Sequence, residues 1–111
     1  MTVLLAALAR AMPSTSVGLG MREYRFSVYR PTVHAGRVTF NMTNFGEDAH
    51  NLRITGPGGY RSAVSPDVEA GERARFAVTL RRAGIYRLVC LKPGHAAKGM
   101  RATLRVVHRH R

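Results

Sequence analysis

The sequence is poor in cysteine and in acidic residues: it has one Cys and six Asp or Glu among 111 residues. The single cysteine, Cys90, has no partner for a disulfide within the chain. It also cannot supply the several thiolates of a cysteine-rich zinc site, an iron–sulfur cluster or a binuclear copper site. A buried packing role or a mononuclear metal site remains open for this thiol.

Long hydrophobic runs are also lacking, because the apolar run at residues 3–9 is too short to cross a bilayer. The run has the length of the apolar core of a secretory signal. Ala9-Arg10-Ala11 offers a small-x-small cleavage site, although no basic segment precedes the run. We therefore predict that residues 1–20 lie outside the fold, as a remnant of a signal peptide or as a flexible N-terminal segment. The protein is then expected to be periplasmic or otherwise exported.

From about residue 21, apolar and polar residues alternate with a period of two, and neither a helical period nor an internal repeat is found. Such alternation is typical of half-buried strands. The alternating runs cover residues 24–28, 38–42, 52–54, 74–80, 86–90 and 102–106. Because glycine-containing turns separate these runs, we predict an all-β domain over residues 21–108. The expected fold is an antiparallel Greek-key β-sandwich or barrel of about seven to eight strands, followed by a basic tail at residues 109–111.

Candidate metal ligands are concentrated late in the chain. Residues 90–100 read Cys-Leu-Lys-Pro-Gly-His-Ala-Ala-Lys-Gly-Met, which places Cys90, His95 and Met100 five residues apart, and His50 lies forty residues before Cys90. Two His, one Cys and a weak Met ligand are the donors of a blue-copper site, whereas zinc favours further thiolates or a carboxylate. His50, Cys90 and Met100 share the parity of the core-facing residues beside them. We therefore expect the four side chains to gather at one end of the sandwich.

Together these features resemble the cupredoxins, the plastocyanin and azurin family of type 1 blue-copper proteins. The resemblance extends from about Met21 to Val107. It is carried by residues 33–40, 44–52, 68–72, 84–90 and 90–100. It implies one type 1 copper ion per chain, held by His50, Cys90 and His95, with Met100 as the weak axial ligand.

The resemblance also implies roles for residues beside the ligands. Asn51 is similar to the asparagine that ties the two ligand loops together, and Ala49 and Pro93 would lie next to the ligands. In many relatives a Ser or Thr directly after the Cys ligand pairs with this asparagine, and here Leu91 takes that place. A backbone N–H donated to the sulfur of Cys90 would favour Cu(I) and raise the reduction potential.

In this family the second His ligand would carry electrons to the surface. The ring edge of His95 would be the electron port, and Ala96 and Ala97 would belong to the apolar patch around it. Lys92 and Lys98 flank His95 in a chain whose net charge is +12. Cationic groups beside a port attract acidic surfaces, so we predict docking on an acidic face of redox partner proteins.

The resemblance to the cupredoxins also predicts a monomeric electron shuttle that is not an enzyme. The net charge also suits peripheral association with an anionic membrane. Nucleic-acid binding is not expected, because it would need exposed aromatic residues among the Arg side chains. Five aromatic residues fall instead on the inward parity: Tyr24, Phe26, Phe40, Phe76 and Tyr86.

Two alternatives use the same residues. Copper delivery, storage or tolerance on this fold would need an open site that exchanges metal, and a complete ligand set favours electron transfer. A hydrolase would use Cys90 as nucleophile, His50 or His95 as base and Asn51 to orient it. This is disfavoured because neighbouring strand residues such as His50 and Asn51 point to opposite faces. Acyl transfer also has no use for Met100.

Overall fold

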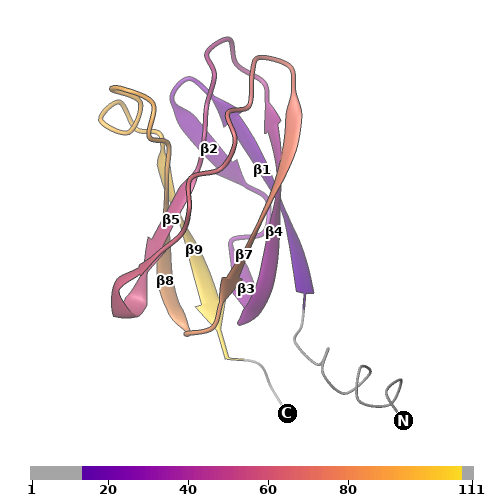
Figure 1. Ribbon diagram of the computed structural model, residues 1–111, viewed down its shortest axis with the longest axis vertical. Coiled ribbons are helices and arrows are strands. Elements are labelled where there is room, and N and C mark those ends of the chain that lie inside the picture. The colour runs from indigo at the N-terminus through magenta and orange to yellow at the C-terminus, as the bar shows by residue number, and fades with distance from the viewer. Residues whose placement is uncertain (1–13, 109–111) are drawn as a thin grey trace.

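The computed structural model describes residues 14–108, in which two β-sheets pack face to face (Figure 1). The expected all-β sandwich is confirmed, and its sheets remain separate instead of closing into a barrel. The signal-like run at residues 3–9 and the basic tail at residues 109–111 lie outside the described residues. Within the described part of the chain, no helix has the length and apolar character that crossing a membrane requires.

Each sheet mixes parallel and antiparallel neighbours. One sheet has the order β2 (Arg25–Val28), β1 (Ser14–Arg22), β4 (Gly36–Asn44) and β7 (Arg73–Leu80). The other has the order β3 (Thr32–His34), β9 (Arg101–Val107), β8 (Gly84–Val89), β5 (Arg53–Gly56) and β6 (Tyr60–Arg61), with the short 3-10 turn η1 (Pro57–Gly59) between β5 and β6. β1 with β4 and β3 with β9 are parallel, and the other pairs are antiparallel. The expected antiparallel pairing is therefore corrected for these two pairs alone, because alternation shows which face of a strand is buried and not which way the strand runs.

Strand β1 corrects the predicted domain boundary. The stretch 14–20 belongs to this strand and pairs with β4, so the prediction that residues 1–20 lie outside the fold is wrong for these residues. The apolar side chains at alternate positions, Val17 and Leu19, are at most 1% exposed. The residues between them are small, and Gly and Ser weaken the sequence signal of a strand. The ring of Tyr29 lies over Gly18, in the space that a β-carbon would occupy, so the small residues accommodate a side chain from outside the strand.

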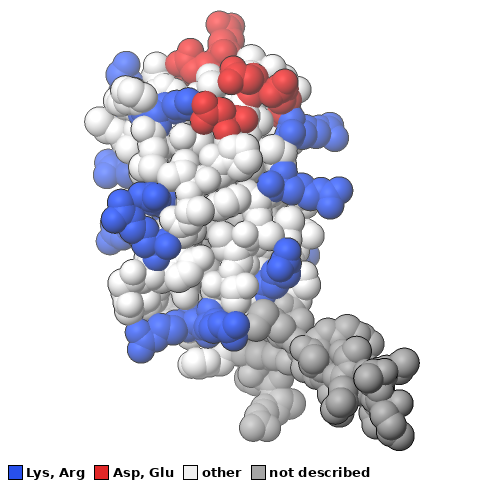
Figure 2. Space-filling model, in the orientation of Figure 1, with Lys and Arg blue, Asp and Glu red and all other residues white. Residues whose placement is uncertain are grey.

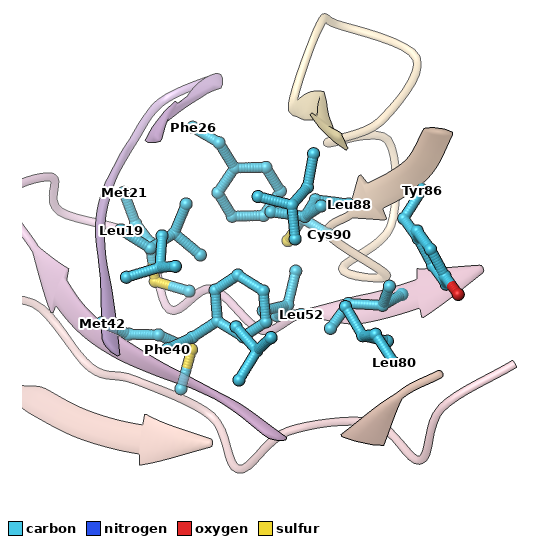
Figure 3. Close-up of a cluster of buried hydrophobic side chains, with 14 of the residues drawn as sticks. Leu19, Met21, Phe26, Phe40, Met42, Leu52, Leu80, Tyr86, Leu88 and Cys90 are labelled. Atoms are coloured by element: carbon cyan, nitrogen blue, oxygen red, sulfur yellow. The ribbon is translucent and has the colours of Figure 1, made fainter. Parts of the chain in front are cut away.

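The core fills the space between the sheets and continues to the end of the sandwich that carries the candidate ligands. Phe40 from β4 and Tyr86 from β8 are among its largest buried side chains (Figure 3). Leu52 and Cys90 belong to the same cluster, each at most 1% exposed. Each Å² of apolar surface that is buried stabilises the folded state by about 25 cal/mol. The ligand-bearing segments are therefore anchored on the packed core, and this limits how far the candidate donors can move.

Candidate metal centre

Three side chains converge at one end of the sandwich: His50, Cys90 and His95. Their donor atoms all lie within 4.8 Å of one another. Nδ1 of His95 is 3.2 Å from Nδ1 of His50 and 3.6 Å from Sγ of Cys90. His50 and Cys90 are 0% and 1% exposed, and the side chain of His95 is 12% exposed. The structure thus brings together three of the four predicted ligands in a largely buried cluster, with His95 nearest the surface.

Two of the candidate donors lie directly beside the ends of strands. Cys90 directly follows β8, and Met100 directly precedes β9. The N–H of Cys90 donates to the carbonyl of Met100 (3.2 Å), and the N–H of Met100 donates to the carbonyl of His95 (3.0 Å). Met100, the fourth predicted ligand, is fully buried beside the other three. His50 is fixed from another direction, by a β-bridge in which its backbone pairs with Val68.

The loop between Cys90 and Met100 is held by its own backbone. The N–H of His95 donates to the carbonyl of Lys92 (3.1 Å), and the N–H of Lys98 donates to the carbonyl of Gly94 (3.2 Å). Gly94 has a φ of 78° and Gly99 a φ of 117°, conformations that residues with a β-carbon rarely adopt. The glycines therefore let the loop turn tightly enough to aim His95 back at Cys90.

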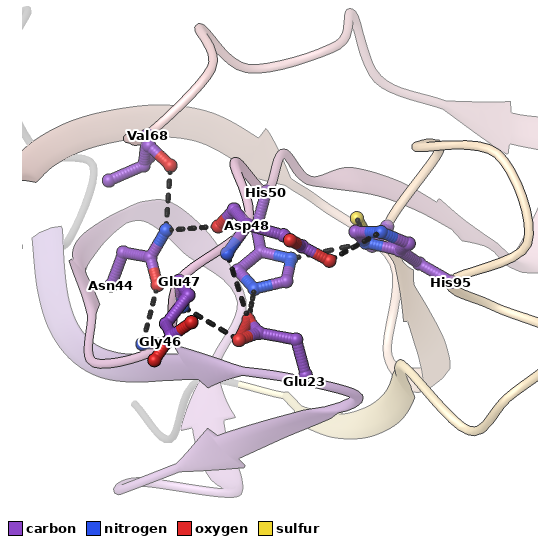
Figure 4. Close-up of polar contacts among 9 residues, drawn as sticks. Glu23, Asn44, Gly46, Glu47, Asp48, His50, Val68 and His95 are labelled. Carbon is purple, nitrogen blue, oxygen red and sulfur yellow. Dashed lines mark hydrogen bonds and ion pairs between the residues drawn. The ribbon is translucent and has the colours of Figure 1, made fainter. Parts of the chain in front are cut away.

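Glu23, which neither residue type nor spacing along the chain marks as part of the site, contacts a candidate ligand. It lies between β1 and β2, and its Oε2 is 2.7 Å from Nε2 of His50 (Figure 4). The same carboxylate accepts the N–H groups of Glu47 (2.6 Å) and Asp48 (3.3 Å). The N–H of Glu47, more than any other group, lowers the pKa of Glu23, and hydrogen bonding to His50 lowers it further. Glu23 therefore joins the loop before His50 to the ring of His50.

Asn44 supports the same loop from inside. Its side-chain N–H groups donate to the carbonyls of Asp48 and Val68, both at 2.8 Å, and its side-chain oxygen accepts the N–H of Gly46 (2.8 Å) (Figure 4). Asn44 is 1% exposed, so these bonds satisfy a buried amide. The polypeptide leading to His50 is thus fixed by two side chains, Asn44 and Glu23.

The predicted tie between the ligand loops is present in a modified form. Oδ1 of Asn51 accepts the N–H of Leu91 at 2.8 Å. The backbone after Cys90 therefore replaces the Ser or Thr hydroxyl that many cupredoxins would use, and Leu91 is compatible with the tie. Of the other two residues expected beside the ligands, Ala49 is half-buried and Pro93 is exposed.

The surroundings of His95 differ from the expected cationic port. Oδ2 of Asp48 is 3.6 Å from Nε2 of His95, and the ring of Tyr24 meets the imidazole edge to face at a centroid distance of 5.0 Å. Nζ of Lys92 is 2.5 Å from Oδ2 of Asp67, and this hydrogen bond lowers the pKa of Asp67 and raises that of Lys92. One of the two predicted docking lysines is thus paired within the protein.

The second predicted docking lysine lies over an aromatic ring. Nζ of Lys98 is 4.8 Å from the ring centroid of Tyr24. Ala97 and Lys98 are exposed, and Ala96 is half-buried.

The donor chemistry of this cluster is selective. One thiolate, two imidazoles and a thioether suit copper, because zinc sites are built from thiolates, imidazoles and carboxylates. Both imidazoles present Nδ1 to the cluster, and the Nε2 atoms face carboxylates: Glu23 behind His50 and Asp48 behind His95. Such outer partners are common behind metal-binding histidines, where they fix the ring orientation.

Comparison with known proteins supports the fold. No family model and no curated protein sequence matches the chain. Among solved structures, the "blue" copper protein auracyanin A from Chloroflexus aurantiacus is similar, with a TM-score of 0.70 and 20% identity over 86% of this chain and 100% of that one.

Rusticyanin from Thiobacillus ferrooxidans has a TM-score of 0.61 and 20% identity over 96% of this chain and 94% of that one. The Cu-containing nitrite reductase from Thermus scotoductus has a TM-score of 0.64 and 19% identity, and the match covers 89% of this chain and 29% of the enzyme. At these identities the likeness shows the fold alone.

Proposed function

We propose that this chain, which has the cupredoxin fold, binds one type 1 copper ion and carries single electrons between redox partners. The observation that carries the proposal is the buried cluster of His50, Cys90 and His95 with Met100 beside it. A copper ion bound there would supply a one-electron Cu(I)/Cu(II) couple. The chain supplies the donors, keeps water away from them and holds them in place.

The fixed geometry suits electron transfer. Little rearrangement between the two oxidation states favours rapid exchange, and this protein restrains its donors through backbone hydrogen bonds in the 91–99 loop and through Asn44, Asn51 and Glu23. A copper-delivery or storage protein would instead need an open site from which the metal departs easily. Burial of His50 and Cys90 therefore favours the shuttle over the delivery role.

An enzyme role is not part of this proposal. The copper nitrite reductase that resembles the chain is much longer, and the chain matches 29% of it. We propose that this protein acts as a monomeric electron carrier in an exported compartment.

For the partner, we propose a protein with an acidic docking face that approaches the flank of the His95 loop. Figure 2 shows acidic side chains gathered at one end of the sandwich, with Lys and Arg along its sides. Arg87 and Arg101 border a depression of about 430 Å³ that Ala96 also lines. The exposed Lys98 belongs to the same loop as Ala96. This flank combines cationic and small apolar side chains, whereas the charge of Lys92 is offset by Asp67.

Metal preference and redox cycling test the proposed function. Purified protein is offered copper or zinc, and the retained metal is counted by mass spectrometry. The proposal predicts that copper displaces zinc, that one ion is retained per chain, and that the ion passes reversibly between two oxidation states in a potentiometric titration. Preferential retention of zinc, or rapid loss of copper to a weak chelator, would contradict the electron-carrier role.

A further inference from the structure

The hydrogen bonds of Glu23 determine which nitrogen of His50 is free. An ionised carboxylate only accepts hydrogen bonds, so the 2.7 Å contact requires Nε2 of His50 to carry the proton. In a neutral imidazole the other nitrogen, Nδ1, then carries a lone pair and no proton. Nδ1 is the atom that faces His95 and the donor cluster. The contact with Glu23 thus leaves His50 in the tautomer that can bind a metal through Nδ1.

A carboxylate is better suited to this position than an amide. Oε1 of Glu23 accepts the N–H of Glu47, while Oε2 accepts from His50 and, at 3.3 Å, from Asp48. Both oxygens therefore act as acceptors toward groups on one loop. A glutamine has one acceptor oxygen and one donor NH₂ group, so it would leave one of these donors facing another donor.

The charge of Glu23 has a second effect. A negative group behind a ligand favours the more positive state of the site, and its hydrogen bond makes the imidazole a stronger donor. Cu(II) carries one more positive charge than Cu(I). An ionised Glu23 is therefore expected to strengthen Cu(II) binding more than Cu(I) binding, and so to lower the reduction potential.

We propose that Glu23 is a positioning residue of the copper site, which fixes His50 in the Nε2–H tautomer and holds the reduction potential down. This inference rests on the proposed copper function, although the tautomer can be measured without copper. Neither the ligand spacing nor the loop sequence around Cys90 points to Glu23, because it acts from the turn between β1 and β2.

The test compares Glu23→Gln and Glu23→Ala with a matched control, Glu47→Gln. Glu47 is an exposed carboxylate in the loop before His50, and its backbone N–H donates to Glu23. Its substitution therefore removes one negative charge close to Glu23 and keeps the contact between Glu23 and His50. The first readout is the tautomer of His50 in copper-free protein, measured by ¹⁵N NMR in mildly alkaline buffer. The second is the reduction potential of the copper-loaded protein.

We expect a single Nε2–H tautomer in the wild type and in Glu47→Gln, and a mixture in both Glu23 variants. Cu(II) affinity should fall about tenfold to a hundredfold in the Glu23 variants, and Cu(I) affinity should fall less. If the Cu(II) affinity falls tenfold more than the Cu(I) affinity, the reduction potential rises by about 59 mV. The Glu47 variant should stay close to the wild type.

An Nδ1–H tautomer in the wild type would overturn the proposal, as would equal potentials for Glu23→Gln and Glu47→Gln. If Glu23 served only to hold the loop, its variants would lose stability while tautomer and potential stayed unchanged. If the protein bound no copper, the proposed function would fail, and the tautomer measurement would still decide whether Glu23 positions His50.

Discussion

The thioether of Met100 is the weakest donor of the proposed site, and its effect can be isolated. Met100 is fully buried, and leucine is close to it in volume, so Met100→Leu should fold normally. The variant should keep one copper ion per chain and show a higher reduction potential, because a donor that favours Cu(II) is removed. Cyclic voltammetry of both proteins measures the change. An unchanged potential would show that Met100 is no axial ligand.

Single residues also show what the sequence could and could not reveal about the site. His50, Cys90, His95 and Met100 were predictable because their chemical types and spacing match a known donor set. Glu23 was not, since its partners lie more than twenty residues away and the contact exists only once β1 and the loop before His50 meet.

The ion pair between Lys92 and Asp67 could not be foreseen for the same reason. Local spacing identifies ligands that share a loop, and it does not identify the groups that fold against them.

Among the structural elements, β1 is the longest strand that the alternation of apolar and polar residues did not reveal. Its small residues look like a linker, and its parallel pairing with β4 is a contact between segments that no hairpin turn joins. The strands around the ligand loop, β8 and β9, were predictable because their alternation is strong and their antiparallel pairing follows directly along the chain.

The contribution of β1 to stability can be measured with one substitution. Leu19 is 1% exposed, and Leu19→Ala should lower the free energy of unfolding by about 2–5 kcal/mol through lost burial and a residual cavity. Ser16→Ala, an exposed position on the same strand, is the control and should change it by less than about 0.5 kcal/mol. Urea denaturation of copper-free protein gives both values. A negligible effect of Leu19→Ala would mean that β1 lies outside the cooperative unit.

The turn that joins β7 to β8 carries a pH-dependent contact. The hydroxyl of Tyr86 donates to the carbonyl of Arg82 at 2.8 Å, and burial raises the pKa of Tyr86. The pKa of Tyr86 is therefore higher in the folded protein than in the unfolded chain, where it is about 10. The contribution of Tyr86 to stability is complete at pH values below the unfolded pKa and is lost as the pH rises through the folded pKa.

Tyr86→Phe should therefore lower the free energy of unfolding by about 1 kcal/mol at neutral pH. The variant should also lose less stability than the wild type as the pH becomes alkaline. Tyr29→Phe is the control, because the side chain of Tyr29 is 65% exposed. Thermal unfolding across a series of alkaline buffers measures both effects. An equally steep alkaline loss in Tyr86→Phe and in the wild type would show that Tyr86 is not its source.

At the scale of the whole molecule, the charge pattern bears on partner recognition. The net charge is +12, yet all six acidic residues come from segments at or near the end that carries the site. A partner with an acidic face would be repelled from these carboxylates and attracted to the arginine-rich flank. The composition gives the net charge, and only the fold shows that the acidic residues are separated from most of the basic ones.

Docking on this flank predicts a salt-dependent rate. Lys98→Glu and Arg101→Glu should each slow electron exchange with an acidic partner on the order of tenfold at low salt. The effect should shrink as the Debye length falls to about 8 Å at physiological ionic strength. Arg75→Glu, on β7 of the other sheet, is the control. Stopped-flow measurements over a salt series give the rate of electron exchange for each variant. The docking proposal would be contradicted if the rate depended on salt equally in all three variants.

His50, Cys90, His95 and Met100 are proposed to form one type 1 copper site. The most direct measurement is the addition of Cu(II) to purified protein, followed by visible and EPR spectroscopy. We expect an intense visible band that saturates at one equivalent and that ascorbate bleaches reversibly. Cys90→Ala should abolish this band, because the chain has no other thiol. Colourless Cu(II) binding, or a band that survives Cys90→Ala, would contradict the proposed copper site.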